Sequence, residues 1–162
     1  MISENMAKKL QHQMNREIYS GYLYLGMAAY ADSTGKPGFA HWFRRQFHEE
    51  LEHAERFYDY LINQGARVMM EPIEQPPQEF SSAPELFEKT LAHEKAVTGL
   101  IHDLVEAAKQ EDDKATEEFL QWFVKEQIEE ELTPANIIKK IDNTGRDEAG
   151  VAKIDEQLVL RK

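Results

Sequence analysis

The stretch FRRQFHEELEHAERFYDYL, residues 43–61, decides the fold class of this chain. Its apolar residues recur every three to four positions, which is the spacing of one face of an α-helix. Phe47, Ala54 and Phe57 belong to this apolar stripe, and Glu50 and His53 interrupt it. A polar group inside an apolar stripe is costly unless it is paired or bound to something. The stretch therefore predicts a long bundle helix that carries binding groups on its inner face.

The same pattern, an apolar stripe that contains one glutamate, occurs in three further segments. The glutamates in these stripes are Glu17, Glu94 and Glu130. A shorter amphipathic segment follows near the C-terminus and predicts a fifth helix. The predicted helices cover about residues 4–32, 38–64, 83–110, 114–142 and 147–160. We therefore predict a single all-α domain that spans residues 1–162.

The connections between these helices indicate the topology. Short turns near Gly35 and Asp112 join antiparallel neighbours, because a short loop cannot carry the chain to the far end of a bundle. The segment from Ala66 to Pro84 is longer and contains four prolines, so we expect little regular structure in it. Extended, it reaches roughly 60 Å, and the preceding helix is only about 40 Å long. The sequence thus predicts a four-helix bundle with one long crossover.

The spacing within each helical hairpin predicts that the four glutamates meet. Residues equally far from the turn of an antiparallel hairpin lie at the same height. The midpoint of Glu17 and Glu50 falls in the first short turn, and that of Glu94 and Glu130 falls in the second. His53 follows Glu50 by three residues and lies on a neighbouring ridge. Four carboxylates and one imidazole at one level suit a pair of transition-metal ions.

A helical bundle or interaction module without metal is the other interpretation of this pattern. A single glutamate or a single Glu-x-x-His motif does not exclude it, since most glutamates are solvated surface groups. The conjunction of four matched positions, two matched turns and one imidazole favours the metal centre. Pro134, four residues after Glu130, cannot donate to the Glu130 carbonyl, so we also expect a kink there.

Composition excludes several classes of function. The chain has no cysteine, which excludes disulfides, thiolate metal sites and cysteine nucleophiles. Its net charge of −11 disfavours nucleic acid as a partner and favours attraction of cations. The first residues lack the apolar run of a signal peptide, and no segment is apolar enough to span a bilayer. We therefore expect a cytoplasmic protein with no membrane partner.

Four motifs resemble the non-haem ferritins of bacteria and archaea. They are EIYSGYLYL (17–25), EELEHA (49–54), HE (93–94) and EQIEEE (126–131). The resemblance covers essentially the whole chain and implies a ferritin-like four-helix bundle with a short fifth C-terminal helix. It also implies an iron-storage protein with ferroxidase activity, which oxidises Fe(II) to Fe(III) with dioxygen or hydrogen peroxide. The product would be stored as mineral in a hollow homo-oligomeric cage of twenty-four subunits.

The resemblance further implies roles for individual residues. Glu17, Glu50 and His53 would hold the first iron of a di-iron centre. Glu50, Glu94 and Glu130 would hold the second, with Gln127 nearby. Glu49, Glu126 and Glu129 would form a third, weaker iron site that shares Glu130. Tyr24 and Trp122 would lie beside the centre as electron donors or radical sinks.

Three related families differ from this chain in identifiable residues. Bacterioferritins have a second Glu-x-x-His motif where this chain has Gln127-Ile-Glu129-Glu130, and Glu52 replaces their haem-ligating methionine, so we expect no haem. Rubrerythrins carry a Cys-x-x-Cys domain that a chain without cysteine cannot contain. DNA-protecting mini-ferritins bind iron between subunits and lack these glutamates. A non-storage di-iron oxidase, or an oxidative-stress protein of the ferritin-like family, stays open as the alternative.

Overall fold

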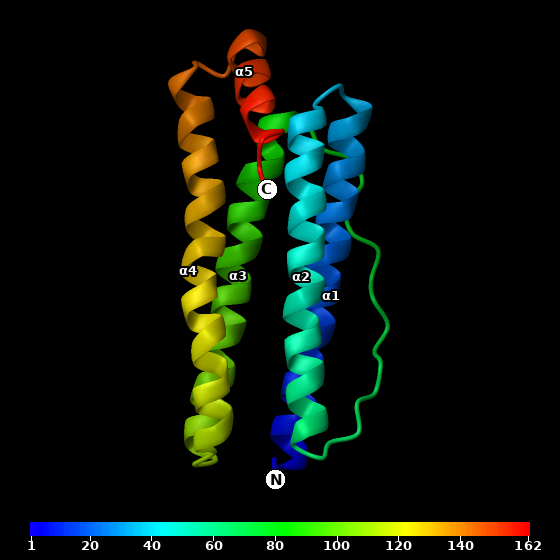
Figure 1. The fold of residues 1–162 in the computed structure, drawn as a ribbon, viewed down its shortest axis with the longest axis vertical. Helices are drawn as coiled ribbons and strands as arrows, with labels where there is room; N and C mark the ends of the chain where they lie inside the picture. Colours follow the sequence, from blue (N-terminus) through cyan, green and yellow to red (C-terminus); the bar gives the residue numbers. More distant parts are fainter.

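The computed structural model describes residues 1–162 and contains five helices and no strand (Figure 1). The helices are α1 (Glu4–Ser33), α2 (Pro37–Asn63), α3 (Ala83–Gln110), α4 (Lys114–Asn143) and α5 (Glu148–Leu158). Helices α1 to α4 lie alongside one another, and α5 lies at the end of the bundle where α1 and α2 are joined. The predicted all-α four-helix bundle with a short fifth helix is confirmed. None of the five helices combines the length and the apolarity that a membrane crossing requires.

The long connection between α2 and α3 runs along the outside of the bundle from one end to the other (Figure 1). The side chain of Asn15 in α1 donates hydrogen bonds to the backbone carbonyls of Glu71 and Pro72, both at 3.2 Å. Arg16 forms an ion pair with Glu74 at 3.2 Å. These contacts hold a segment that has no regular structure and satisfy part of its backbone. Because the connection runs the full length of the bundle, α3 starts at the same end as α2 does.

Two apolar blocks fill the bundle, and a layer of buried polar residues lies between them. The block nearer α5 includes Phe43 and Phe87, and the block nearer the N-terminus includes Phe57 and Phe123. The buried polar residues between the blocks include Glu17, Glu50, His53, Glu94, Gln127 and Glu130. The polar layer is therefore enclosed on two sides by close-packed apolar side chains.

Helix α4 continues through Pro134, which is buried. The missing hydrogen bond to Glu130 therefore does not end the helix at this point. A bend of the helix axis there stays a prediction.

A close contact between α5 and the start of α2 fixes the fifth helix. The Asp155 side chain is buried and accepts a hydrogen bond of 2.8 Å from the backbone N–H of Phe39. It thereby caps α2, where Lys36 makes no capping bond through its own side chain. Gly38 allows this approach, because a Cβ atom there would lie 1.7 Å from the Asp155 carbonyl oxygen. The docking of α5 thus depends on a residue without a side chain.

Replacing Gly38 by alanine should displace α5 and lower the free energy of unfolding by about 1–3 kcal/mol, because the added methyl group overlaps the α5 backbone. Gly99→Ala is the matched control, since a Cβ atom at this exposed position of α3 meets nothing within 4 Å. It should raise the free energy of unfolding by about 0.5–1 kcal/mol. Thermal unfolding followed by circular dichroism measures both variants, and equal stabilisation of the two would contradict the docking of α5 on Gly38.

Candidate metal centre

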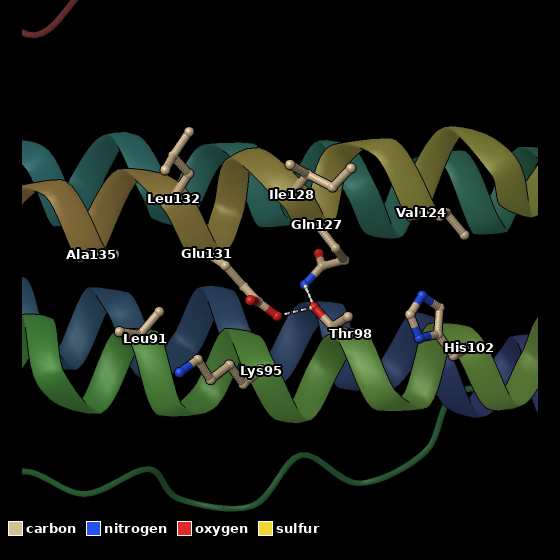
Figure 2. Close-up of a pocket in the computed structure, with 10 residues that line it drawn as sticks. All are labelled: Leu91, Lys95, Thr98, His102, Val124, Gln127, Ile128, Glu131, Leu132 and Ala135. Atoms are coloured by element: carbon tan, nitrogen blue, oxygen red, sulfur yellow. Dashed lines mark hydrogen bonds between the residues drawn. The ribbon is translucent and has the colours of Figure 1, made fainter.

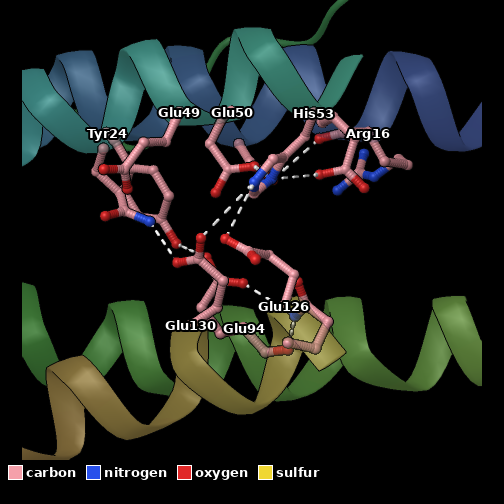
Figure 3. A network of polar contacts seen from close by, with 12 residues as sticks. Arg16, Tyr24, Glu49, Glu50, His53, Glu94, Glu126 and Glu130 are labelled. Carbon is pink, nitrogen blue, oxygen red and sulfur yellow. Dashed lines mark hydrogen bonds and ion pairs between the residues drawn. The ribbon is translucent and has the colours of Figure 1, made fainter. Parts of the chain in front are cut away.

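The four glutamates that interrupt the apolar stripes meet in the middle of the bundle (Figure 3). Glu17 comes from α1, Glu50 from α2, Glu94 from α3 and Glu130 from α4. Each is between 1% and 7% exposed. None of them forms an ion pair with a lysine or an arginine, and the basic side chain within 4.0 Å of three of them is His53. The layer therefore gathers four acidic side chains that no lysine or arginine balances through an ion pair.

The ligand atoms of these residues form two overlapping groups. Within each group the atoms all lie within 4.8 Å of one another. One group contains Glu17, Glu50 and His53, and the other contains Glu50, Glu94 and Glu130. Glu50 belongs to both groups, so its carboxylate lies between the two positions. A shared carboxylate of this kind suits two neighbouring cations, because it offsets their mutual repulsion.

The imidazole of His53 faces the glutamates with both ring nitrogens. Its Nδ1 atom lies 3.2 Å from Glu50 and 3.9 Å from Glu17, and its Nε2 atom lies 3.8 Å from Glu126. A neutral imidazole has one nitrogen that can bind a cation and one N–H group. If Nδ1 binds a cation, the N–H on Nε2 faces the acidic side chain of Glu126. The ring of Trp122 packs against the imidazole at 5.5 Å between centroids, which restricts its orientation.

Burial raises the pKa values of all four glutamates, and repulsion by neighbouring carboxylates adds to the shift at Glu50, Glu94 and Glu130. The pKa of Glu50 lies well above its usual range because the side chain is desolvated and faces Glu94 and Glu17. Burial likewise holds the pKa of Glu130 well above its usual range. Burial raises the pKa of Glu94 to about 7 and that of Glu17 in the same direction, although His53 opposes the latter shift. Without a cation the layer favours protonated carboxyl groups, and a bound cation would displace their protons.

Tyr24 and Gln127 both hold Glu94. The Tyr24 hydroxyl donates to Oε1 of Glu94, and Nε2 of Gln127 lies 3.2 Å from Oε2. The same amide donates to Thr98 Oγ1 at 3.2 Å, and Thr98 donates to Glu131 at 2.8 Å (Figure 2). These last residues line a surface groove between α3 and α4. Gln127 therefore lies between the buried glutamate layer and a groove open to solvent.

Two amide side chains that bind the glutamates were not predicted from the sequence. Gln13 donates to Glu17 Oε1 at 2.7 Å, and Gln46 donates to Oε2 of Glu130. Both glutamines are buried. Each lies four residues before a stripe glutamate, one turn away on the same helix face, and this spacing is the signal that would have found them. They satisfy carboxylate oxygens without adding charge, as outer partners of metal ligands do.

The structure separates the three residues that the resemblance assigns to a third iron. Glu126 shares a group of ligand atoms with His53, all within 4.8 Å. Glu129 is exposed and belongs to none of the groups described above. Both side-chain oxygens of Glu49 instead accept hydrogen bonds from Arg161, at 2.9 and 2.8 Å. Of these three glutamates, the structure therefore brings only Glu126 to the buried layer.

Comparison with known proteins agrees with this arrangement. A family model described as the ferritin-like domain matches residues 7–144. The bacterial non-heme ferritin of Bacteroides fragilis is 40% identical over 161 residues, which is 99% of this chain and 100% of the relative. That of Escherichia coli O157:H7 is 39% identical over 158 residues, which is 98% of this chain and 96% of the relative.

The solved structures that resemble this chain include an open pore ferritin from the hyperthermophilic archaeon Archaeoglobus fulgidus. It is 46% identical in sequence and superposes with a TM-score of 0.97, and the match covers 100% of both chains. The matches in sequence and in structure extend over the four-helix bundle, the crossover and α5. On this evidence the chain belongs to the ferritin family.

Proposed function

We propose that the protein is a cytoplasmic iron-storage ferritin with ferroxidase activity. It oxidises Fe(II) at the buried centre and stores Fe(III) as mineral inside a hollow cage of twenty-four identical subunits. One observation carries the proposal. Four buried glutamates converge with one histidine, and none of the four forms an ion pair with a lysine or an arginine. The bacterial non-heme ferritins among the sequence relatives support it.

The donor set fits iron as the substrate of this centre. Glu17, Glu50 and His53 would hold one Fe(II), and Glu50, Glu94 and Glu130 would hold the other. Hard carboxylate oxygens stabilise Fe(III) more than Fe(II), and the imidazole keeps a useful affinity for Fe(II). Each Fe(II) gives up one electron, so a pair supplies the two electrons that reduce dioxygen to hydrogen peroxide, or hydrogen peroxide to water.

The residues around the ligands would keep this geometry during turnover. Tyr24 and Gln127 hold the Glu94 carboxylate from two sides, so it keeps its orientation as the charge of the ion changes. Tyr24 is also near enough to the centre to serve as an electron donor. The net charge of −11 attracts Fe(II) toward the protein.

Glu50→Ala and His53→Ala should each slow the rapid phase of aerobic Fe(II) oxidation by more than about tenfold, because each removes a ligand. Stopped-flow absorbance measures this rate. Glu52→Ala and His48→Ala are the matched controls, since both residues are exposed on the same helix, and these variants should keep the parent rate. Parent-like oxidation by the first two variants would remove Glu50 and His53 from the centre.

Zn(II), which has the same charge as Fe(II) but no redox chemistry, should bind more tightly as the pH rises from about 5 to about 8. Below about 7 the Glu94 carboxyl holds a proton that the cation must displace, and the raised pKa values of Glu50 and Glu130 act in the same direction. Isothermal titration calorimetry in two buffers of different ionisation enthalpy counts the released protons. A Zn(II) affinity that does not change over this range would contradict the protonated layer.

The same raised pKa values also affect the stability of the metal-free protein. Folding raises the pKa of Glu94 from its usual 4.5 to about 7, so the protonated Glu94 carboxyl stabilises the folded state fully below about pH 4.5. This stabilisation is lost as the pH rises through about 7. Metal-free protein should therefore become easier to unfold by urea over this range. Glu94→Gln does not titrate, so it should release fewer protons on Zn(II) binding and show a weaker pH dependence of unfolding.

The storage proposal requires a cage, and we propose that α5 takes part in the contacts between subunits. The parent chain should have the native mass of a cage and should load iron far beyond two ions per chain. A chain that ends at Thr144 should lose the cage, as measured by light scattering. A full cage from this shortened chain would reject the role of α5, and iron loading that stops at two ions per parent chain would favour the non-storage oxidase.

A further inference from the structure

The residues that follow α5 return to α2 near the metal centre. The guanidinium of Arg161 stacks on the ring of Trp42, with 4.6 Å between its Cζ atom and the ring centroid. It also donates to the Trp42 backbone carbonyl at 3.0 Å. The ring of His41 contacts the backbone carbonyl of Arg161 at 2.6 Å. Both the side chain and the main chain thus hold Arg161 against α2.

The guanidinium of Arg161 is connected to Glu130 of the buried centre through the side chain of Gln46. Its Nη2 atom donates to Gln46 Oε1 at 3.1 Å, and the amide nitrogen of Gln46 donates to Glu130. A glutamine side chain accepts at one end and donates at the other. The contact with Arg161 therefore orients Gln46 so that its N–H groups face Glu130. Two successive hydrogen bonds connect the C-terminal tail with a predicted iron ligand.

Arg161 is also the counter-ion of Glu49. Its Nη2 atom lies 2.9 and 2.8 Å from the two carboxylate oxygens, and this pair is only partly exposed, with 21% of the Arg161 side chain and 34% of the Glu49 side chain accessible. The same Nη2 atom contacts Gln46, and Gln46 donates to Glu130, so Glu49 and Glu130 belong to one hydrogen-bond network that runs through Arg161 and Gln46. The guanidinium takes a lone pair of each Glu49 oxygen and places a positive charge beside them, and this charge opposes the approach of a metal cation to the same carboxylate.

We propose that Arg161 is a built-in counter-ion that limits the centre to two metal ions. While its guanidinium binds Glu49, that carboxylate cannot join Glu126 and Glu130 around a third cation. Removing the charge of Arg161 frees Glu49 and admits that cation. This inference rests on the proposed function, because it takes two ions bound by the buried glutamates as its starting point.

Anaerobic calorimetry with Zn(II) tests the proposal by counting the ions bound per chain. The parent protein should bind two, and Arg161→Gln should bind a third. Adding Glu49→Gln to Arg161→Gln should abolish the third ion, because the freed carboxylate is then gone. Arg161→Lys keeps a cation beside Glu49 and should remain at two.

Two further variants separate this role from a merely structural one. Lys162→Gln removes the neighbouring tail charge, which is exposed, and should leave the count at two. Arg161→Met keeps an unbranched stem against Trp42 without the charge, so it should bind a third ion even if Arg161→Gln fails to fold. Native mass and thermal unfolding check the assembly and the fold of every variant.

The number of Zn(II) ions bound per chain tests the proposed function and the role of Arg161 separately. A parent chain that binds no Zn(II) would reject the proposed function. Two ions in the parent and also in Arg161→Met would overturn the role of Arg161 and leave the proposed function intact. Three ions in the parent would overturn it as well, since Arg161 would then exclude nothing.

Discussion

The burial of four carboxylates in one layer, none of them ion-paired to a lysine or an arginine, is the constraint on which the rest of this structure depends. Desolvation raises the pKa values of all four, and repulsion between carboxylates adds to this at Glu50, Glu94 and Glu130, so the metal-free fold favours the protonated forms. The apolar blocks on either side, which include Phe43 and Phe57, supply the burial that holds this layer together. A pair of divalent cations bound in this layer would balance the charge of the deprotonated carboxylates.

The topology of the bundle places the four glutamates in one layer. Each helical hairpin places two glutamates at one height, and the crossover brings the second hairpin to the same level as the first. A second set of side chains then orients the carboxylates. Tyr24, Gln127, Gln13 and Gln46 donate hydrogen bonds to them without adding charge. A metal ion bound there would therefore supply the positive charge that these four side chains do not.

Helix α5 and the tail behind it connect one end of the bundle with this layer. Asp155 caps α2 at its start, and Arg161 contacts α2 further along, beside Glu49 and Gln46. The resemblance predicted Glu49, Glu126 and Glu129 as ligands of a third iron. The structure instead gives Glu49 an arginine partner and leaves Glu129 exposed. Glu49, which the resemblance assigns to a metal ion, thus pairs with an arginine that follows α5.

The sequence by itself determined the five helices, the crossover and the level at which Glu17, Glu50, Glu94 and Glu130 lie, because helical periodicity and distance from a turn are local properties. It placed Glu50 and Glu130 in the inward stripes, but it could not decide whether their neighbours Glu49, Glu126 and Glu129 also reach the buried layer. Only the tertiary structure decided that Arg161 pairs with Glu49, 112 residues earlier, and that Gln46 binds Glu130, 84 residues later. The first contact depends on how α5 docks on α2, which the packing of Gly38 against Asp155 sets. The second joins α2 to α4 and depends on how the two helical hairpins pack together. No periodic pattern in the sequence predicts either contact.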